Sequence, residues 1–262
     1  MDQRTRTEDL AREKWTLERM LSIRYWTPTL LSFRTTRPAA FRFTPGHYTR
    51  LGFDAADGAV WRPYSLASAA DEDFLDFIAV LVPGGAFSEQ LKQLRAGDRL
   101  RVDTASYGFL TVNQLAPGKD LWLLASGTGL GPFVSILRDA AVWRNFERLV
   151  LVHSVRHSSE LAWREEISAL SAAFPTAKAT LRYIPIVTRE PGATPLAQRI
   201  PLLLADGRLE QAAETPLTLV DSRLMVCGNP ELARELREYL SARGFATNRR
   251  NVPGQMAFEK YW

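Results

Sequence analysis

Four short stretches of this sequence have residue types that suit the binding of phosphate groups and planar rings. They are Trp61 to Ser68 (WRPYSLAS), Pro83 to Ser88 (PGGAFS), Gly127 to Pro132 (GTGLGP) and Cys227 to Pro230 (CGNP). Arginine is a two-pronged donor to phosphate, and tyrosine has a flat face for a ring. Glycine removes the side chain that would hold a ligand away from the backbone. These residue types together predict a ligand that carries both phosphate and a ring.

The glycine-rich turn GTGLGP lies within an uncharged stretch from Leu121 to Leu137. Its apolar run Leu121 to Ala125 predicts a strand buried on both faces, and Pro132 opens a second apolar run with helical spacing. Proline suits the first helical position, and the helix N-terminus stabilises a nearby phosphate by about 0.3 to 1 kcal/mol. An ordinary strand–helix turn is the alternative, because the spacing GxGxGP differs from the GxGxxG dinucleotide motif. A membrane span is disfavoured by the three glycines, the central proline and a length below about 20 residues.

The strand motif places Arg62 and Tyr64 two residues apart and hence on one face, as an elongated ligand would require. Pro63 cannot donate a ladder hydrogen bond, so it limits the strand to an edge or a rim. An ordinary surface strand is the alternative. In PGGAFS, Ser88 is a natural N-cap for a short helix near residues 88–94, and the turn would present free N–H groups to a pyrophosphate. A capped surface helix explains that motif equally well.

Composition excludes several classes of function. The 262 residues are 46% hydrophobic and 24% charged, as is typical of one or two globular domains. The single cysteine, Cys227, excludes an internal disulfide and a four-thiolate iron–sulfur cluster, and three scattered histidines do not make a metal site. The net charge of +4 favours an acidic or phosphate-bearing partner, but the clustered basic and aromatic pattern of nucleic-acid binding is absent. Because the charged N-terminus has no apolar signal segment, we expect a cytoplasmic protein that binds neither nucleic acid nor membrane.

The spacing of apolar residues divides the chain into three parts. We expect an N-terminal arm over residues 1–13, a barrel domain over 14–116 and an α/β domain over 117–262, with the boundary in the loop 116–119. Six β-rich stretches predict an antiparallel barrel, with strands within residues 15–53 and at 59–65, 74–82 and 99–104. Apolar strands then alternate with amphipathic helices, which predicts a parallel sheet. The strands are expected at 121–125, 148–154, 180–187 and 223–227, and the helices at 132–143, 161–174, 196–204 and 231–243.

The motifs RPYS, GTGLGP and CGNP, followed by the ending EKYW at Glu259 to Trp262, resemble those of the ferredoxin-NADP reductase family. The resemblance is to its bacterial subclass whose chains end in Tyr-Trp, and it covers nearly the whole chain after the arm. It implies a two-domain fold, in which a six-stranded antiparallel β-barrel binds FAD and a following α/β parallel-sheet domain binds NADP. This division agrees with the one drawn from the apolar pattern.

The resemblance implies that one group of barrel residues holds the pyrophosphate and the ring of FAD. The pyrophosphate would be bound by Arg62 and by the turn Gly85, Ala86, Phe87 and Ser88. Tyr64 would pack on the isoalloxazine ring, and Ser65 would lie near flavin N5.

Other FAD contacts implied by the resemblance come from elsewhere in the chain. Ala79 and Val80 would line the path of the ribityl chain and adenine, and Thr128 would lie close to both cofactors. The two terminal aromatics would stack as well, Tyr261 on the flavin and Trp262 on its adenine. Large aromatics are otherwise unexpected at a free chain end, which is normally polar and disordered. A core or dimer contact is the alternative for them.

The choice between NAD and NADP can be tested at the second strand of the α/β part. NAD-preferring enzymes place an acid about 20 residues past the glycine turn, whereas a 2′-phosphate needs arginine. Here Arg156 follows the strand, and no acid occurs before Glu160. NADP is therefore favoured. The family places further phosphate-binding residues where this chain has Thr188, Arg189 and Arg199.

The nicotinamide end of NADP is expected near the two other turns. The GTGLGP turn, including Gly129, would belong to NADP rather than to FAD. Asn229 has the residue type and position of an N-cap, so capping alone would explain it. By resemblance, the residues around the nicotinamide come from both domains: Ser65, Cys227, Gly228 and Glu259. Buried cysteine is usually inert, and we do not expect Cys227 to act as a nucleophile.

The sequence therefore predicts an FAD-dependent oxidoreductase. It would transfer electrons between NADP(H) and a small acidic one-electron carrier, ferredoxin or flavodoxin, in the direction of NADPH oxidation. We expect a monomer. The reductase component of a multi-component oxygenase is the alternative enzyme, and a redox-sensing module that binds both cofactors without turnover is the alternative from another class.

Overall fold

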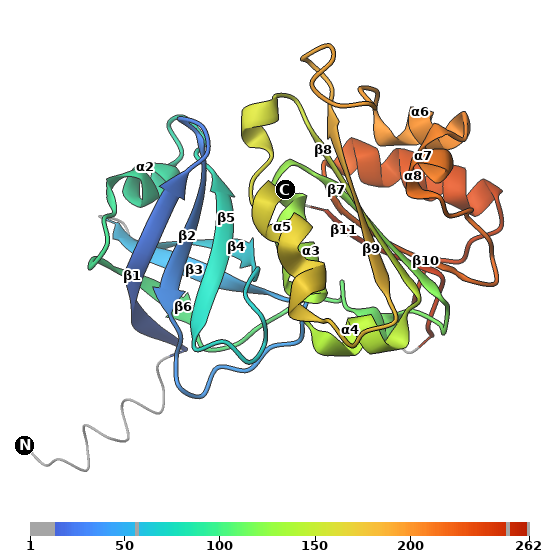
Figure 1. Cartoon of the computed structure of the whole chain (residues 1–262). Helices are drawn as coiled ribbons and strands as arrows, with labels where there is room; N and C mark the ends of the chain where they lie inside the picture. Colours follow the sequence, from blue (N-terminus) through green and yellow to red (C-terminus); the bar gives the residue numbers. More distant parts are fainter. Residues whose placement is uncertain (1–13, 56–57, 250–251, 261–262) are drawn as a thin grey trace, which may run out of the picture.

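The computed structural model describes residues 14–55, 58–249 and 252–260. An antiparallel sheet from the N-terminal half of the chain lies beside a parallel sheet with helices from the C-terminal half (Figure 1). The fold class predicted from the sequence is thus confirmed. The placement of the boundary at 116–119 stays a prediction, and the expected arm at 1–13 lies outside the described residues.

The antiparallel sheet curls into a barrel. Its strands are β1 (Trp15–Tyr25), β2 (Leu30–Thr36), β3 (Tyr48–Ala55), β4 (Gly58–Ser65), β5 (Phe74–Val80) and β6 (Arg99–Asp103), in the order β4-β3-β6-β1-β2-β5. The two edge strands β4 and β5 contact each other without being joined in the hydrogen-bonded order. Pro63 lies in edge strand β4, as its missing donor requires. Apolar side chains fill the barrel, with Phe33 stacked on Phe77 at 5.2 Å between ring centroids.

A short helix, α2 (Ala86–Gln93), packs against the barrel through Phe87 and Leu91. The prediction that Ser88 caps this helix was wrong. The N-cap is Gly85, and no side chain bonds to the first turn. Ser88 lies one turn further in, where its Oγ accepts a hydrogen bond from the Val82 N–H at 2.9 Å. Its hydroxyl therefore stabilises the chain that enters the helix rather than the helix end.

The C-terminal half is built on a parallel sheet of five strands. They are β7 (Asp120–Ser126), β8 (Arg148–Val155), β9 (Thr180–Val187), β10 (Ser222–Gly228) and β11 (Met256–Lys260), in the order β11-β10-β7-β8-β9. The first four were predicted to within two residues, because apolar residues dominate each of them. Strand β11 was not predicted. It pairs in register with β10, so that Glu259 lies beside Cys227.

Helices cover both faces of the parallel sheet. One face packs on α6 (Ile200–Ala205), α7 (Arg208–Ala213) and α8 (Pro230–Ala242). The other packs on α3 (Gly131–Leu137), α4 (Ala140–Asn145) and α5 (Arg164–Ala169). Helices α3 and α5 lie between the sheet and the barrel, and α4 lies at one end of the sheet (Figure 1). The apolar core on this second face continues into the barrel through Leu30, Ala67 and Ile78. This cluster therefore spans both halves, while the interior of the barrel and the other face of the sheet have clusters of their own.

Three predicted helices are shorter than expected. The segment 132–143 is broken in two, because the Asp139 carboxylate accepts from the Ala141 N–H and so starts α4 as a new helix. The segment 161–174 has α5 flanked by two 3-10 turns, η3 (Ser158–Glu160) and η4 (Leu170–Ala173). The helix predicted at 196–204 begins only at Ile200, and Pro201 occupies the first turn of α6.

Two contact regions hold the halves together. Trp26 of the barrel meets Trp163 edge to face at 6.5 Å between ring centroids, and Arg24 pairs with Glu166 at 2.7 Å. Trp163 has a left-handed backbone with φ of 55° and is buried at the start of α5. In the second region, Arg138 at the end of α3 donates to Asp76 Oδ2 at 3.1 Å and to the Ala67 carbonyl at 3.0 Å.

We expect Arg138→Met to lower the free energy of unfolding by about 1 to 2 kcal/mol, because it removes two hydrogen bonds of a charged, mostly buried group. The loss stays moderate because Asp76 keeps a two-pronged contact with Arg34, at 2.7 and 2.9 Å. Urea unfolding would measure it. The matched control is Arg234→Met, which breaks an exposed pair with Glu238 and should cost less than about 0.5 kcal/mol. Equal losses for the two variants would contradict the bridging role of Arg138.

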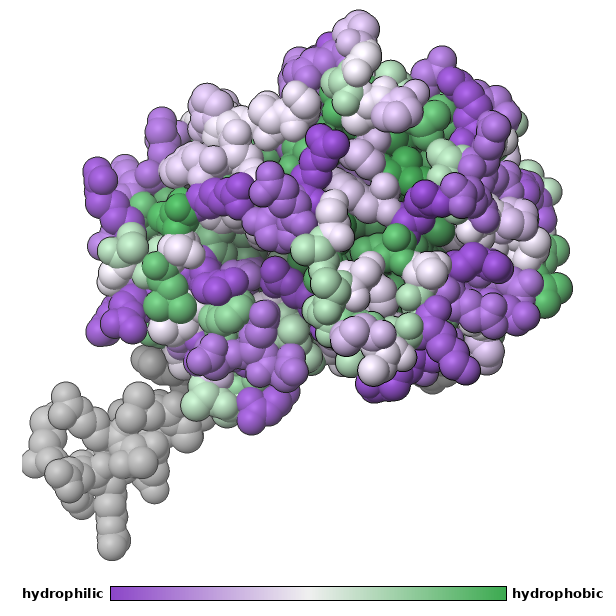
Figure 2. Space-filling view, viewed as in Figure 1, coloured by the Kyte–Doolittle hydropathy of each residue, from purple (hydrophilic) through white to green (hydrophobic). Residues whose placement is uncertain are grey.

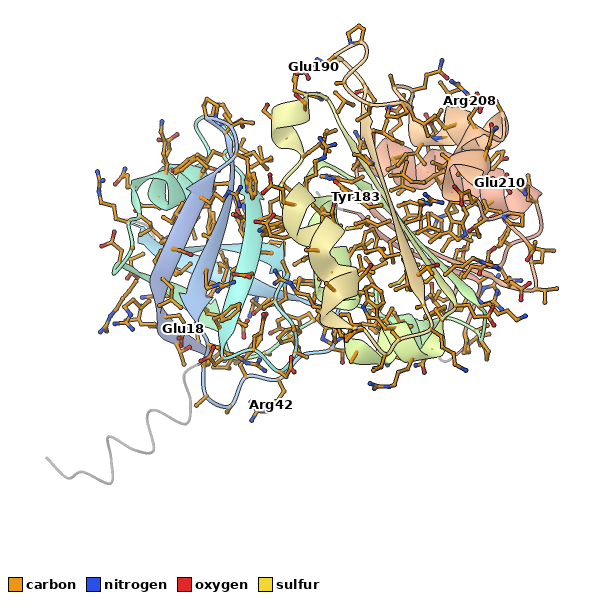
Figure 3. The ribbon with its side chains drawn as sticks, in the orientation of Figure 1. Glu18, Arg42, Tyr183, Glu190, Arg208 and Glu210 are labelled. Atoms are coloured by element: carbon orange, nitrogen blue, oxygen red, sulfur yellow. The ribbon has the colours of Figure 1, made fainter. Side chains whose placement is uncertain are left out.

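No helix within the described ranges is both long and apolar enough to cross a membrane. On the face viewed in Figure 2, hydrophilic residues cover much of the surface and apolar residues show as patches between them. The side chains of the described residues are drawn in Figure 3.

Candidate functional site

The parallel sheet has a topological switch point between β7 and β10. The chain leaves β7 toward β8 on one side of the sheet, and β10 lies on the other side. In open α/β sheets, ligands bind in the crevice outside the carboxyl ends of the strands at such a point. A cleft of about 820 Å3 lies there, lined by residues that follow β7, β8, β9 and β10 and by the barrel residues Thr29, Leu30 and Val80. The residues that line it from the α/β half include Ser126, Gly127, Thr128, Ser154, Arg156, Glu160, Thr188, Arg189, Arg199, Asn229 and Glu231.

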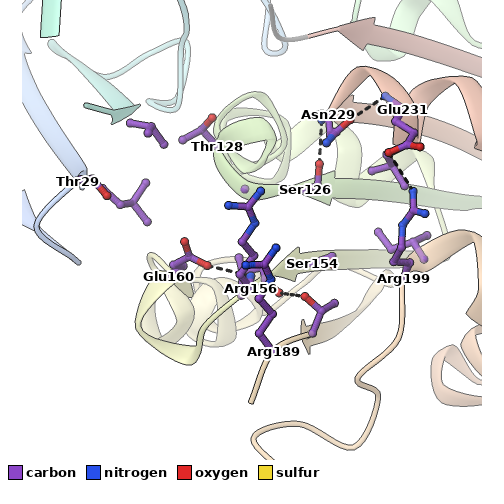
Figure 4. Close-up of a pocket in the computed structure, with 17 residues that line it drawn as sticks. Thr29, Ser126, Thr128, Ser154, Arg156, Glu160, Arg189, Arg199, Asn229 and Glu231 are labelled. Atoms are coloured by element: carbon purple, nitrogen blue, oxygen red, sulfur yellow. Dashed lines mark hydrogen bonds and ion pairs between the residues drawn. The ribbon is translucent and has the colours of Figure 1, made fainter. Parts of the chain in front are cut away.

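Two of the predicted phosphate-binding arginines have free guanidinium groups in this cleft. Arg156 follows β8 and Arg189 follows β9, and the Arg189 N–H donates to the Arg156 carbonyl at 2.9 Å. Neither guanidinium has a hydrogen bond or ion pair with any residue that the structure describes. Figure 4 shows both side chains in the cleft. Two free guanidinium groups fit a ligand that carries a phosphate.

The third arginine is differently placed. The Arg199 guanidinium also lines the cleft, but it pairs with Glu235 at 3.0 Å and with Glu231 at 3.7 Å (Figure 4). A phosphate that bound there would compete with two carboxylates. Thr188 lines the cleft beside Arg189, with its Oγ1 donating to the Val155 carbonyl at 3.0 Å.

The glycine turn that follows β7 packs tightly against the end of β10. It forms a 3-10 turn, η2 (Gly127–Leu130), which runs directly into α3. A Cβ on Gly129 would lie 2.3 Å from the Cys227 carbonyl oxygen, so only glycine allows this approach. Gly228 has φ of +130°, and a Cβ there would lie 2.3 Å from Ser126 Oγ. Gly129 and Gly228 thus allow the turn and the end of β10 to pack closely beside the cleft, although neither residue lines it.

Two hydrogen bonds hold this turn from neighbouring strands. Ser126 Oγ accepts from the Asn229 N–H at 2.9 Å, and Asn229 caps α8 by accepting from the Glu231 N–H at 2.7 Å, as predicted. His153, on β8, makes a 3.0 Å hydrogen bond through Nε2 to the Gly127 carbonyl. Burial lowers the pKa of His153 to about 4, so the ring is neutral near pH 7 and Nε2 carries the donated proton. The sequence analysis did not identify His153 as part of the site.

The predicted FAD residues of the barrel lie outside the cleft, apart from Val80. Arg62 is exposed on β4, with its guanidinium donating to the Trp61 carbonyl at 2.8 Å. Tyr64 packs on Phe87 at 5.3 Å between ring centroids, and burial raises its pKa to about 12. Gly85 and Ala86 form the start of α2 at the surface. The side chains of Ala79, Phe87 and Ser88 are buried, so only their backbone could reach a ligand.

A third group of predicted residues meets where the two halves touch. Cys227 and Glu259 are register partners on β10 and β11, and Glu259 interacts with Ser65 of the barrel. Gly131 lies nearby, since a Cβ there would be 3.8 Å from Ser65 Cβ, and Thr128 belongs to the turn η2 that leads into α3. The predicted set Ser65, Cys227 and Glu259 is thus brought together from three distant parts of the chain.

The charge state of this junction is unusual. Burial raises the pKa of Glu259 to about 7, opposed by the Ser65 side chain, and Glu259 Oε2 has no hydrogen-bond partner among the described residues. The pKa of the Cys227 thiol is raised well above its usual range, by burial and then by Glu259. Cys227 is therefore a neutral thiol near pH 7 and a poor nucleophile. An unpartnered buried carboxyl fits a polar ring edge placed against it.

Sequence reasoning missed several lining residues, among them Thr29, Ser126, Ser154 and Glu160. A signal was available for two of them, because Ser126 and Ser154 end apolar strands and the carboxyl ends of parallel strands meet at one edge. Thr29 carried no such signal, since it lies in a barrel loop. The predicted residues Tyr261 and Trp262 lie outside the described part of the chain.

We expect the stability of the protein to depend on pH through Glu259. The pKa of Glu259 is higher in the folded protein than in the unfolded chain, so the folded state binds more protons between about pH 4.5 and 7 and loses stability as the pH rises through that range. Glu259→Gln removes this dependence. Relative to the wild type, the variant should gain about 2 kcal/mol on going from pH 5 to pH 8. Urea unfolding at both pH values would measure it, and parallel pH curves would contradict the assignment.

Known proteins resemble the chain over both halves. The family model "Oxidoreductase FAD-binding domain" matches residues 21–109, and "Oxidoreductase NAD-binding domain" matches residues 123–238. Ferredoxin–NADP reductase A of Sorangium cellulosum is 37% identical, with 94% of this chain and 90% of that protein covered. Ferredoxin–NADP reductase of Pseudomonas aeruginosa is 35% identical, with 93% and 96% covered. A crystal structure of a ferredoxin NADP+ reductase from Neisseria gonorrhoeae with bound FAD and NADP superposes with a TM-score of 0.88 at 36% identity, covering 95% of this chain and 99% of that one.

Proposed function

This chain belongs to the ferredoxin–NADP reductase family, and we propose on that premise that it is an FAD-dependent enzyme that transfers electrons between NADP(H) and a small one-electron carrier. The observation that carries the proposal is the cleft at the switch point of the parallel sheet. It contains two guanidinium groups without partners among the described residues, and it opens toward the barrel at Thr29 and Val80. A phosphate-bearing nucleotide held there would reach the junction of the two halves.

The α/β half would bind NADP(H). Arg156 and Arg189 would contact the 2′-phosphate, with Thr188 and Arg199 further along the cleft. Two charge-assisted contacts, from Arg156 and Arg189, at about 1.5 to 3 kcal/mol each would be enough for a hundredfold preference over NAD(H). Gly129, Gly228 and Asn229 would leave room for the nicotinamide at the strand ends.

The barrel half would bind FAD. Arg62 and the turn Gly85 to Ser88 would hold the pyrophosphate, with Ala79 and Val80 along the chain toward adenine. Tyr64, Ser65 and Thr128 would surround the ring, and Tyr261 and Trp262 would stack on the cofactor. Bound FAD would supply the redox chemistry, taking two electrons from NADPH and releasing them singly.

The residues at the junction would orient the rings and control a proton. Cys227 and Gly228 would allow a close, dry approach, because the end of β10 carries only small side chains there. Glu259 would gain or lose a proton near neutral pH beside Ser65, since its pKa lies at about 7. We assign Ser65, Cys227 and Glu259 to this catalytic junction.

The electron carrier would be ferredoxin or flavodoxin, both of which are acidic, and NADPH oxidation would be the direction. The net charge of +4 supports an acidic partner. The protein would act as a monomer in the cytoplasm. A reductase component of an oxygenase would share the same cleft and differ only in its carrier.

The absorption spectrum of the purified protein tests this proposal. We expect flavin bands that are bleached by NADPH and far more slowly by NADH at equal concentration. The rates of reduction of ferredoxin, flavodoxin and an oxygenase component would then identify the carrier. A colourless protein that does not take up FAD would refute the proposal. Flavin bands that NADPH does not bleach would indicate a sensor rather than an enzyme.

A further inference from the structure

Two carboxylates hold the backbone that carries Arg156. Glu160 Oε2 accepts hydrogen bonds from the Arg156 and His157 N–H groups, both at 2.8 Å. Glu190 binds the next residues, with Oε2 accepting from the Ser158 N–H at 3.1 Å and Oε1 lying 3.2 Å from His157 Nδ1. Three consecutive N–H groups of this turn therefore end on carboxylate oxygens.

Glu190 differs from Glu160 because it comes from the neighbouring loop. It follows Arg189 after β9, and Figure 3 shows it near the end of the parallel sheet. The two loops already run together past the strands, since the Thr188 N–H donates to the Val155 carbonyl at 3.0 Å. The carboxylate of Glu190 extends this pairing to residues 157 and 158. Glu190 thus links the turn that carries Arg156 to the turn that carries Arg189.

The contacts of Glu190 oppose the electrostatic repulsion between Arg156 and Arg189. Arg156 and Arg189 place two positive charges in one cleft, and no described residue pairs with either guanidinium. Like charges repel each other, so without a bound phosphate the two loops would tend to separate. Glu190 binds the Ser158 N–H and the His157 ring rather than either guanidinium. It therefore keeps the loops together and leaves both arginines available.

We propose that Glu190 is a positioning residue for recognition of the 2′-phosphate of NADP(H), acting through the turn that carries Arg156. The proposal rests on the proposed function, because it assumes that NADP(H) binds in this cleft. The proposal predicts that replacing Glu190 weakens NADP(H) binding, whereas an effect of charge alone would strengthen it. A carboxylate near a phosphate repels it, so removing the charge alone should strengthen binding. Loss of the contacts that Glu190 makes with Ser158 and His157 should weaken NADP(H) binding.

The test measures dissociation constants of NADP+, NAD+, 2′-phospho-AMP and AMP for the FAD-loaded protein by calorimetry. Glu190→Ala should weaken NADP+ and 2′-phospho-AMP by roughly fivefold, as expected for loss of exposed charged contacts, and leave NAD+ and AMP within about twofold. Glu190→Gln keeps one acceptor oxygen and should show a smaller loss of the same sign. The KM for NADPH should rise, while kcat should stay within about twofold of the wild type.

Glu231→Gln is the matched control for charge. Glu231 lines the cleft that holds Arg156 and Arg189, and it pairs with Arg199, but its carboxylate accepts no backbone N–H from the described residues. Removing its charge should tighten NADP+ by about twofold, because Arg199 loses a competitor and the cleft loses a negative charge. Glu190→Gln and Glu231→Gln each remove one negative charge, beside the cleft and within it respectively, and should change NADP+ affinity in opposite directions.

Two results would overturn the role of Glu190. Tighter or unchanged NADP+ binding in Glu190→Ala would show that the carboxylate acts only by its charge or not at all. Equal weakening of NADP+ and NAD+, accompanied by a lower melting temperature, would show a general structural role. Failure of the proposed function itself would appear separately, as a wild-type protein that does not prefer NADP+ over NAD+.

Discussion

Replacing Arg156 with alanine should weaken NADP(H) by about 10- to 100-fold and leave NAD(H) within about twofold, since a hydrogen bond to a charged group contributes about 1.5 to 3 kcal/mol. The Arg156 guanidinium lines the cleft and has no partner among the described residues, so its removal leaves no buried group unsatisfied. The loss should therefore fall on the 2′-phosphate alone. Titration of the flavin spectrum with each nucleotide would measure it.

Arg208→Ala is a suitable control for this substitution. Arg208 is also an exposed arginine of the α/β half, but its guanidinium pairs with Asp206 at 2.6 Å and does not line the cleft. Its removal should change the affinity for both nucleotides by less than about twofold. If Arg156→Ala weakened NADPH and NADH equally, the 2′-phosphate would have to bind elsewhere.

Replacing Gly129 with alanine should cost about 3 kcal/mol or more and abolish nucleotide binding in the cleft, because overpacking against the backbone cannot be relieved by a rotamer change. The added Cβ would lie 2.3 Å from the Cys227 carbonyl oxygen and 2.7 Å from the Gly228 nitrogen. The turn η2 would have to move away from β10. That movement would also shift Thr128, which belongs to the same turn and lines the cleft.

Gly127→Ala, two residues earlier, is the matched control. Gly127 has φ of +54° but a Cβ there would meet nothing within 4 Å. Only the left-handed backbone would be strained, at about 1 to 2 kcal/mol. Thermal unfolding and NADP+ titration of both variants would separate the two causes. Equal effects at the two positions would show that backbone conformation, rather than the contact with β10, makes glycine necessary in this turn.

Local sequence determined much of the scaffold of the site. The segments that become β7, β8, β9 and β10 read directly as strands because apolar residues dominate each of them, although Arg182 interrupts the run in β9. Asn229 was predictable as a cap and Pro63 as an edge residue, since both follow from what one side chain can donate or accept within its own few residues. Arg156 could be predicted as a phosphate-binding candidate because it lies about the expected number of residues after the glycine turn.

Local signals failed where packing gives a side chain a partner that its residue type does not indicate. Ser88 has the residue type of a cap, but Val82 gives its hydroxyl a better-placed donor. The resemblance implied that Arg199 binds phosphate, which stays a prediction, but no pattern indicated that α8 places Glu231 and Glu235 against its side chain. Such contacts depend on how helices and loops pack, which a linear pattern does not contain.

The sequence by itself determined the order of strands and turns, the cofactor chemistry implied by arginine and glycine, and the caps of single helices. Only the tertiary structure decided which strand ends meet. The last strand, β11, pairs with β10 and so places Glu259 beside Cys227 and against Ser65. The loop after β9 reaches back to the turn after β8 through Glu190. Strand register and loop packing over long chain distances create these contacts, and neighbouring residues do not specify either of them.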